Sequence, residues 1–200
     1  MYYKGEKIER PKDGHDAGHD FHGYGPAIRK EIEKLIPKGK AVKALDVGTG
    51  FASNVTFLSE HLSKKSKIWT IDSSEEMLES AKVEMHSQKL DKNVTFLVAD
   101  ASHLEFENGS FDLIVSVMVL HHIENLKSAL SEMSRVLKKD GEMIVADYLP
   151  SAGKHLDFKS RHHEKDFFNP EDAEKILKKS GISNVEITKK DHWYLILARK

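Results

Sequence analysis

A short apolar strand that opens into a glycine turn constrains the fold of this chain most strongly. The strand covers residues 42–47, the turn follows at Gly48 and Gly50, and a segment of helical character begins at Ser53. Glycines let the backbone approach a ligand closely, and the first N–H groups of the following helix attract a polar or anionic group. Because such turns also occur for purely structural reasons, the stretch only favours a site for a nucleoside-containing cofactor.

Carboxylates accompany this turn on the neighbouring strands. Asp46 lies in the first strand, residues 67–71 lead to Asp72, and residues 93–99 lead to Asp100. Open α/β sheets bind their ligands at the carboxyl ends of the strands. Asp72 also follows the glycines at the distance where an acidic residue meets ribose hydroxyls in dinucleotide folds. We therefore expect the three carboxylates to gather at one edge of a parallel sheet.

The order of these motifs resembles that of the class I S-adenosylmethionine-dependent methyltransferases, in particular their small-molecule branch. The resemblance covers roughly residues 41–200 and rests on five matches in family order, at residues 45–50, 71–72, 98–101, 110–122 and 135–142. Ala52 stands where the family often has a third glycine, so we expect a bulkier turn here.

The resemblance implies an α/β fold, a Rossmann-like three-layer sandwich around a seven-stranded, mostly parallel sheet with an antiparallel closing strand. Residues 1–40 are expected to form an N-terminal lid and the first helix, and residues 41–200 the S-adenosylmethionine-binding domain, in one globular unit. The apolar run 111–120 predicts a central strand covered on both faces. Helices are predicted at residues 26–35, 53–63, 73–89 and 170–179, and Ser73 is the expected cap of the third.

Composition narrows the possible partners. A net charge of −1 without a basic cluster argues against an obligatory nucleic-acid partner. No apolar run approaches the roughly 20 residues that cross a bilayer, and the N-terminus does not read as a signal peptide. Cysteine is absent. These features predict a cytoplasmic protein without membrane insertion and leave its oligomeric state open.

The resemblance implies S-adenosyl-L-methionine as the cofactor. Asp72 is expected to accept hydrogen bonds from the ribose, Asp100 from the adenine amino group, and Asp46 to orient the turn or bond the ammonium group. The structural alternative is a helix or turn cap for Asp46, a solvated charge at the strand end for Asp72 and a helix N-cap for Asp100. For Met77 the alternative is a core position. The complete set of expected cofactor contacts is Asp46, Gly48, Thr49, Gly50, Asp72, Ser73, Met77, Asp100, Ala101 and Ser116.

Histidines suggest the catalytic chemistry. His121 and His122 end the predicted central strand, beside the expected methyl group, and at least one of them should face the acceptor as a general base. A second group near the N-terminus, of His15, His19 and His22, would either hold a metal or form an exposed tail, and we assign no metal site. The acceptor pocket is expected to include His22, Tyr24 and Tyr148, together with residues 149–168 that contain His155, His162 and His163.

The predicted reaction is in-line transfer of a methyl group to a small-molecule acceptor, with residues 1–25 as a lid over the cofactor. A non-catalytic S-adenosylmethionine-binding sensor or partner module is the alternative. An NAD-dependent oxidoreductase is less favoured, because Ser53 stands where the dinucleotide fingerprint has its third small residue.

Overall fold

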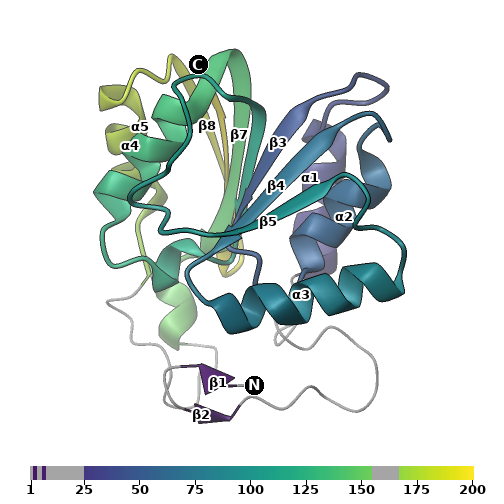
Figure 1. Ribbon diagram of the computed structural model, residues 1–200. Coiled ribbons are helices and arrows are strands. Elements are labelled where there is room, and N and C mark those ends of the chain that lie inside the picture. The colour runs from purple at the N-terminus through teal and green to yellow at the C-terminus, as the bar shows by residue number, and fades with distance from the viewer. Residues whose placement is uncertain (1, 4–5, 8–24, 155–166) are drawn as a thin grey trace.

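A computed structural model describes residues 2–3, 6–7, 25–154 and 167–200. A seven-stranded sheet forms the centre of the fold, and helices lie on either side of it (Figure 1). The strand order is β5-β4-β3-β6-β7-β9-β8. The strands are β3 (Lys43–Val47), β4 (Lys67–Asp72), β5 (Val94–Val98), β6 (Phe111–Val117), β7 (Leu137–Tyr148), β8 (Asn184–Lys190) and β9 (Trp193–Arg199). Neighbouring strands from β5 to β7 are parallel, whereas β9 is antiparallel to both β7 and β8. The predicted fold class is therefore confirmed.

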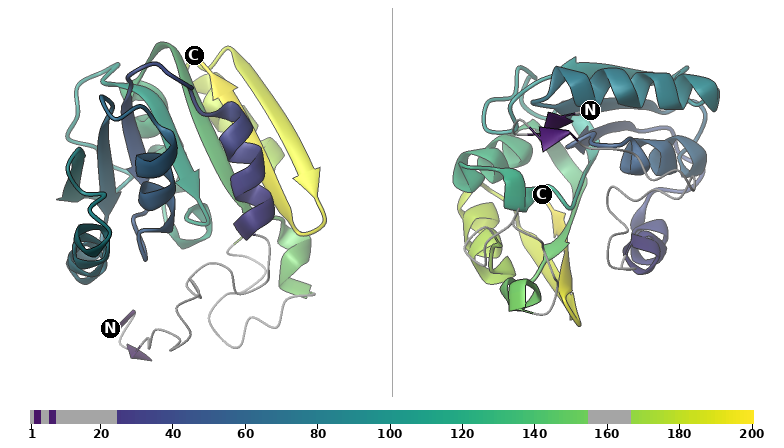
Figure 2. Two further views of the ribbon diagram at one scale, coloured as in Figure 1. Left: turned by 90° about the vertical axis from the view of Figure 1, so that its right-hand side faces the viewer. Right: turned by 90° about the horizontal axis from the view of Figure 1, so that it is seen from below.

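Helices cover both faces of this sheet and give the three layers (Figure 2). One face carries α1 (Gly25–Leu35), α2 (Ser53–His61) and α3 (Glu75–Ser87), and the other carries α4 (Leu126–Val136) and α5 (Pro170–Lys179). The salt bridge between Lys190 and Glu31, at 2.9 Å, ties α1 to the end of β8. Short elements complete the described part: strands β1 (Tyr2–Tyr3) and β2 (Glu6–Lys7), and the 3-10 turns η1 (Leu120–His122) and η2 (Pro150–Lys154). No helix in the described ranges is long and apolar enough to cross a membrane.

The central strand is shorter than its apolar run predicts. It ends at Val117, and Met118 takes a left-handed backbone conformation with φ 59°. The chain then enters η1, so that His121 and His122 lie on a 3-10 turn and not on the strand. The prediction of a strand to residue 120 was wrong, because an apolar run does not reveal where the backbone leaves the extended region.

The cap of α3 also differs from the prediction. The helix begins at Glu75, and the Ser74 hydroxyl accepts a hydrogen bond from the Met77 N–H at 3.2 Å. Ser73 is exposed and lies one residue before this cap. The Asp72 side chain accepts a hydrogen bond from the Ser74 N–H at 3.0 Å, and the helix begins at the next residue.

Candidate functional site at the carboxyl ends of the strands

The Asp72 carboxylate joins the two loops that follow β3 and β4. Its Oδ2 accepts a hydrogen bond from the Gly50 N–H at 2.9 Å, and its Oδ1 accepts from the Ser74 N–H at 3.0 Å. The residue is half-buried. A carboxylate has about four acceptor sites, so these two bonds leave capacity for ligand hydroxyls. Asp72 therefore organises the glycine turn in addition to the ligand role predicted for it.

Gly48 is the residue of the turn that no other amino acid replaces easily. Its φ is +88°, and a Cβ built there would lie 2.3 Å from Cγ2 of Val119. The N–H groups of Gly48 and Thr49 both donate to the Ile71 carbonyl, at 2.8 and 3.0 Å. These bonds hold the turn against the end of β4.

Ala52, at the position of the third family glycine, is buried and left-handed with φ 70°. It precedes α2 as the N-cap without a side-chain capping bond. The departure from the family pattern thus has a conformational consequence: alanine occupies a backbone geometry that glycine adopts with less strain.

A buried chain of hydroxyl groups lies beneath the turn. The Thr70 hydroxyl donates to Oδ2 of Asp46 at 2.7 Å, and the hydroxyls of Thr49 and Thr70 are 2.6 Å apart. Asp46 is fully buried, and its Oδ1 has no hydrogen-bond partner among the described residues. Burial raises the pKa of Asp46 to about 7, while the bond from Thr70 opposes this rise. Sequence reasoning missed Thr70, although a threonine between the apolar residues of a predicted strand was an available signal.

Asp100 lies at the end of β5, exposed, and its Oδ1 accepts a hydrogen bond from the Ser102 N–H at 2.8 Å. This bond lowers the pKa of Asp100. No helix begins at Asp100 in the structure, so the alternative of a helix cap does not apply. Its assignment to adenine, like that of the half-buried Ala101, stays a prediction.

Met77 and Ser116 lie deeper than the other expected cofactor contacts. Met77 is 9% exposed, on the buried side of α3, and Ser116 is fully buried within β6. The Ser116 hydroxyl has no hydrogen-bond partner among the described residues. Met77 fits its core alternative by burial, and contact of Met77 or Ser116 with a cofactor stays a prediction.

His121 forms a buried pair with Asp147, a residue that sequence reasoning missed. Its Nδ1 lies 2.7 Å from Oδ1 of Asp147, and the two side chains are 4% and 2% exposed. The rings of Tyr148 and Phe167 lie 5.8 and 5.7 Å from the His121 ring. Neighbouring His122 is exposed, with its ring centroid 4.1 Å from that of His121. An aspartate inside the apolar end of β7 was the available signal, because a buried carboxylate requires partners.

Arg135 of α4 holds the loop between β5 and β6. Its guanidinium donates to the carbonyl groups of Phe106 and Leu104, at 2.7 and 2.8 Å, and pairs with Glu132. Glu132 in turn accepts the Leu104 N–H at 2.8 Å. The loop after Asp100 is thus fixed from the α4 side, which spacing alone did not reveal.

Several predicted residues lie outside the described residues. These are His15, His19, His22 and Tyr24, with most of the proposed lid over residues 1–25, and His155, His162 and His163. Tyr148, the remaining predicted pocket residue, is described and is 6% exposed. Within the described ranges, no cluster of three or more histidine, aspartate or glutamate side chains is placed to hold a metal ion.

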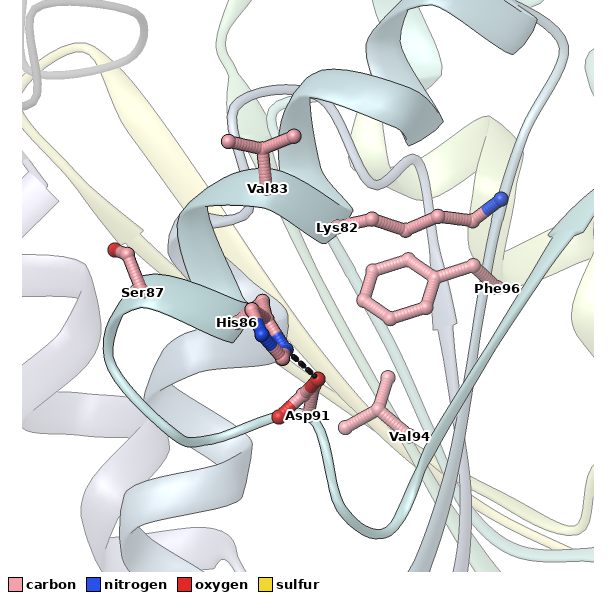
Figure 3. A pocket seen from close by; sticks show the side chains of 7 residues that line it. All are labelled: Lys82, Val83, His86, Ser87, Asp91, Val94 and Phe96. Atoms are coloured by element: carbon pink, nitrogen blue, oxygen red, sulfur yellow. Dashed lines mark hydrogen bonds and ion pairs between the residues drawn. The ribbon is translucent and has the colours of Figure 1, made fainter.

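A hollow of about 600 Å³ lies away from these residues, between α3 and β5 (Figure 3). Its lining is formed by Lys82, Val83, His86, Ser87, Asp91, Val94 and Phe96. His86 and Asp91 form an exposed pair at 2.8 Å at its rim. None of the predicted site residues lines this hollow.

The sheet order defines a Rossmann-like α/β fold, and the glycine turn and Asp72 lie together at the carboxyl ends of its parallel strands. The chain belongs to the methyltransferase domain family, which it matches over residues 45–145. The predicted family is therefore confirmed.

Known proteins support this assignment. The chain is 35% identical over 119 residues to the demethylmenaquinone methyltransferase of Staphylococcus epidermidis, covering 60% of this chain and 48% of that protein. It thus spans about half the length of the curated relatives it matches. A SAM-dependent methyltransferase from Aquifex aeolicus shares the fold with a TM-score of 0.71 at 22% identity, covering 85% of this chain and 88% of that one. The fold also recurs in phosphoethanolamine N-methyltransferase 2 of Haemonchus contortus, solved with phosphomonomethylethanolamine and S-adenosylhomocysteine. Its TM-score is 0.72 at 20% identity, with 89% of this chain and 53% of that chain covered.

Proposed function

We propose that this protein transfers a methyl group from S-adenosyl-L-methionine to a small-molecule acceptor. The observation that carries the proposal is the Asp72 carboxylate, which links the glycine turn to the loop after β4 within a methyltransferase domain. Asp46 shows whether the residues present fit this cofactor. Its buried Oδ1 lacks a hydrogen-bond partner among the described residues, and a carboxylate oxygen of this kind suits a cationic group of a ligand. The residues present therefore fit this cofactor.

Each residue has a distinct task in this proposal. Asp72 would hold the ribose hydroxyls, Asp100 and Ala101 the adenine, and the turn at Gly48 and Gly50 the methionine part. When bound, S-adenosyl-L-methionine supplies a methyl group on a positively charged sulfur, which departs as a neutral thioether. The protein mainly has to orient the acceptor and exclude water.

His121 is the proposed general base. Its imidazole would take the proton from the attacking oxygen, nitrogen or carbon atom of the acceptor and return it to solvent. The buried carboxylate of Asp147 beside it, at 2.7 Å, supports this role over that of the exposed His122. A catalytic pair of this kind also favours an enzyme over a non-catalytic sensor.

A small acceptor agrees with the relatives, whose names specify demethylmenaquinone and phosphoethanolamine as their substrate classes. Aromatic side chains next to His121 suit an acceptor with a flat or cationic group. The predicted cytoplasmic location and the lid over residues 1–25 stay proposals, and deletion of the lid is expected to slow turnover.

The binding test compares wild-type protein with Asp72→Ala by titration calorimetry. S-adenosyl-L-methionine is expected to bind in the micromolar range, and NAD is not expected to compete. Loss of two hydrogen bonds to a charged acceptor, each worth about 1.5 kcal/mol or more, should weaken binding about a hundredfold. Asp91→Ala is the matched control, because it removes an aspartate that pairs with His86 far from the turn.

The catalytic test measures S-adenosylhomocysteine formation with a panel of small acceptors that includes quinols, phenols and amines. Wild-type affinity in Asp72→Ala, or tighter binding of NAD than of S-adenosyl-L-methionine, would contradict the cofactor assignment. Tight binding without turnover on any acceptor would favour the non-catalytic alternative.

A further inference from the structure

We propose that Asp147 is a positioning residue that holds His121 in the orientation and tautomer required for proton transfer. The inference rests on the proposed function, in which His121 serves as the base, and it assigns a role to a residue of β7 that was not among the predicted site residues. Its basis is the pattern of hydrogen bonds around one buried carboxylate.

The Asp147 carboxylate holds both the ring and the backbone of His121. Oδ1 lies 2.7 Å from Nδ1 of the ring, and Oδ2 accepts a hydrogen bond from the main-chain N–H of His121 at 3.2 Å. Oδ1 also accepts from the Tyr148 N–H at 2.7 Å. With three donors around it, the carboxylate has little freedom to rotate, so that the ring of His121 is held in one direction.

This carboxylate belongs to a strand that is paired on both sides within the central sheet. Strand β7 pairs with β6 on one side and with β9 on the other. The Met118 N–H donates to the Ala146 carbonyl at 2.8 Å, which ties the start of the turn before His121 to the strand that carries Asp147. The two residues of the pair are thus connected through the sheet as well as through their side chains.

The chemistry of the pair determines the tautomer. An ionised carboxylate only accepts hydrogen bonds, so Nδ1 of His121 carries the hydrogen that points to Asp147. In a neutral imidazole the other nitrogen, Nε2, is then the proton acceptor. Without Asp147 a neutral ring would also populate the form with its hydrogen on Nε2, which cannot accept a proton there.

Three other titratable residues among those the structure describes lie near the pair: His122, Tyr148 and Tyr194. His122 is exposed, and its ring lies 4.1 Å from that of His121. Tyr148, at the end of β7, has its ring centroid 5.8 Å from that of His121. Tyr194 is the cross-strand partner of Asp147 on β9, and burial together with the Asp147 charge raises the pKa of its hydroxyl well above the usual value. Tyr194 therefore stays neutral, and its buried hydroxyl makes no hydrogen bond to Asp147 or to any other described residue.

The experiment combines NMR with kinetics on the full chain. Protein labelled with ¹⁵N in its histidines gives the tautomer of each ring from long-range couplings, and His121→Gln identifies the signal of His121. Wild-type His121 should carry its hydrogen on Nδ1, whereas Asp147→Asn should move a substantial fraction to Nε2, because the amide can donate to Nδ1. The same variant should lose about 10²- to 10⁴-fold in kcat and keep its affinity for S-adenosyl-L-methionine within about twofold.

Asp112→Asn is the matched control. It neutralises another aspartate of the same sheet, one that pairs with Lys138 at the opposite end of β6. Both the His121 tautomer and kcat should stay at their wild-type values in this variant. An acid limb of the wild-type pH–rate profile that flattens in His121→Gln, and not in Asp112→Asn, supports the assignment of the base.

Three outcomes overturn the inference: a wild-type His121 with its hydrogen on Nε2, an unchanged tautomer in Asp147→Asn, or wild-type turnover in His121→Gln. The first needs no variant, so the inference can be tested even if Asp147→Asn fails to fold. Failure of the proposed function has a different signature, because a wild-type protein that does not bind S-adenosyl-L-methionine still gives the tautomer result.

Discussion

Gly48→Ala tests whether the glycine turn is shaped by close packing as well as by backbone conformation. The new Cβ would lie 2.3 Å from Cγ2, 2.7 Å from Cγ1 and 3.0 Å from Cβ of Val119. Distances this short require the neighbouring side chain or the turn to shift. Because the N–H of Gly48 is bonded to the carbonyl group of Ile71 at 2.8 Å, a shift of the turn also strains its connection to β4.

The expected loss of stability has two parts. A φ of +88° costs an alanine about 1–2 kcal/mol relative to glycine. Overpacking against Val119 adds about 1–3 kcal/mol. We therefore expect the free energy of unfolding to fall by roughly 3 kcal/mol, which for a chain of this size lowers Tm by roughly 6–12 °C.

Gly181→Ala separates the two parts. Its φ of +90° nearly equals that of Gly48, but nothing lies within 4 Å of the new Cβ, so it reports the conformational cost alone. Adding Val119→Ala to Gly48→Ala removes the two closest methyl groups and should recover most of the overpacking cost in a double-mutant cycle.

Urea denaturation monitored by circular dichroism provides the measurement, with calorimetric titration of S-adenosyl-L-methionine on each variant that folds. Equal losses in Gly48→Ala and Gly181→Ala would refute the packing argument. A coupling energy between Gly48→Ala and Val119→Ala below about 0.5 kcal/mol would refute it as well, because the effects of mutations at independent sites already add to within that value.

Three further changes test neighbouring features. Ala52→Gly should change the free energy of unfolding by no more than about 0.5 kcal/mol, because relief of the left-handed conformation offsets the lost methyl group. Ala129→Gly, in the buried face of α4, is the control and should cost more than about 1 kcal/mol. Equal losses of the two variants in thermal denaturation would contradict this. Asp46→Asn should remove a pH dependence of stability. Because the pKa of Asp46 is raised from 3.8 to about 7, the folded protein keeps a proton that the unfolded chain releases, so the free energy of unfolding of the wild type falls as pH rises from about 4 to 7. Urea denaturation across this pH range measures the effect, and an equal dependence of the free energy of unfolding on pH in both proteins would contradict the reasoning. Arg135→Lys should lower the free energy of unfolding by about 2 kcal/mol and speed hydrogen exchange at residues 104–108. The reason is that a lysine cannot bond the loop carbonyl groups and Glu132 at the same time. Unchanged exchange at these residues would count against the role of this arginine.

Local signals explain the parts of the fold that were predictable. Apolar runs and turn residues located β3, β4 and β5 within about two residues, and α5 was predicted with its observed bounds, Pro170–Lys179. Proline at the start of a helix and glycine just after its end act within a few residues, so their effect does not depend on the rest of the chain. Asp72 was also predictable, because a strand end that follows a glycine turn in a parallel sheet has few possible positions.

Local signals failed where the backbone changed direction inside an apolar segment. The run from residue 111 to 120 is continuous in hydropathy, but Met118 is left-handed and ends the strand three residues early. Leu120 is fully buried on the following turn, so burial of apolar side chains continues after the strand has ended. Periodicity reports burial and not the sign of φ, which packing around the turn determines.

The sequence by itself determined the order of the motifs along the chain and the positions of the glycine turn and of Asp72, because each of these is marked by residue types within a few positions of one another. Only the tertiary structure decided the partners of the buried polar groups. Asp46 meets Thr70 across two strands, 24 residues apart, and His121 meets Asp147 26 residues later. Such pairs form because a buried carboxylate must find donors within the assembled sheet, and the donors available depend on strand register and on where each strand ends.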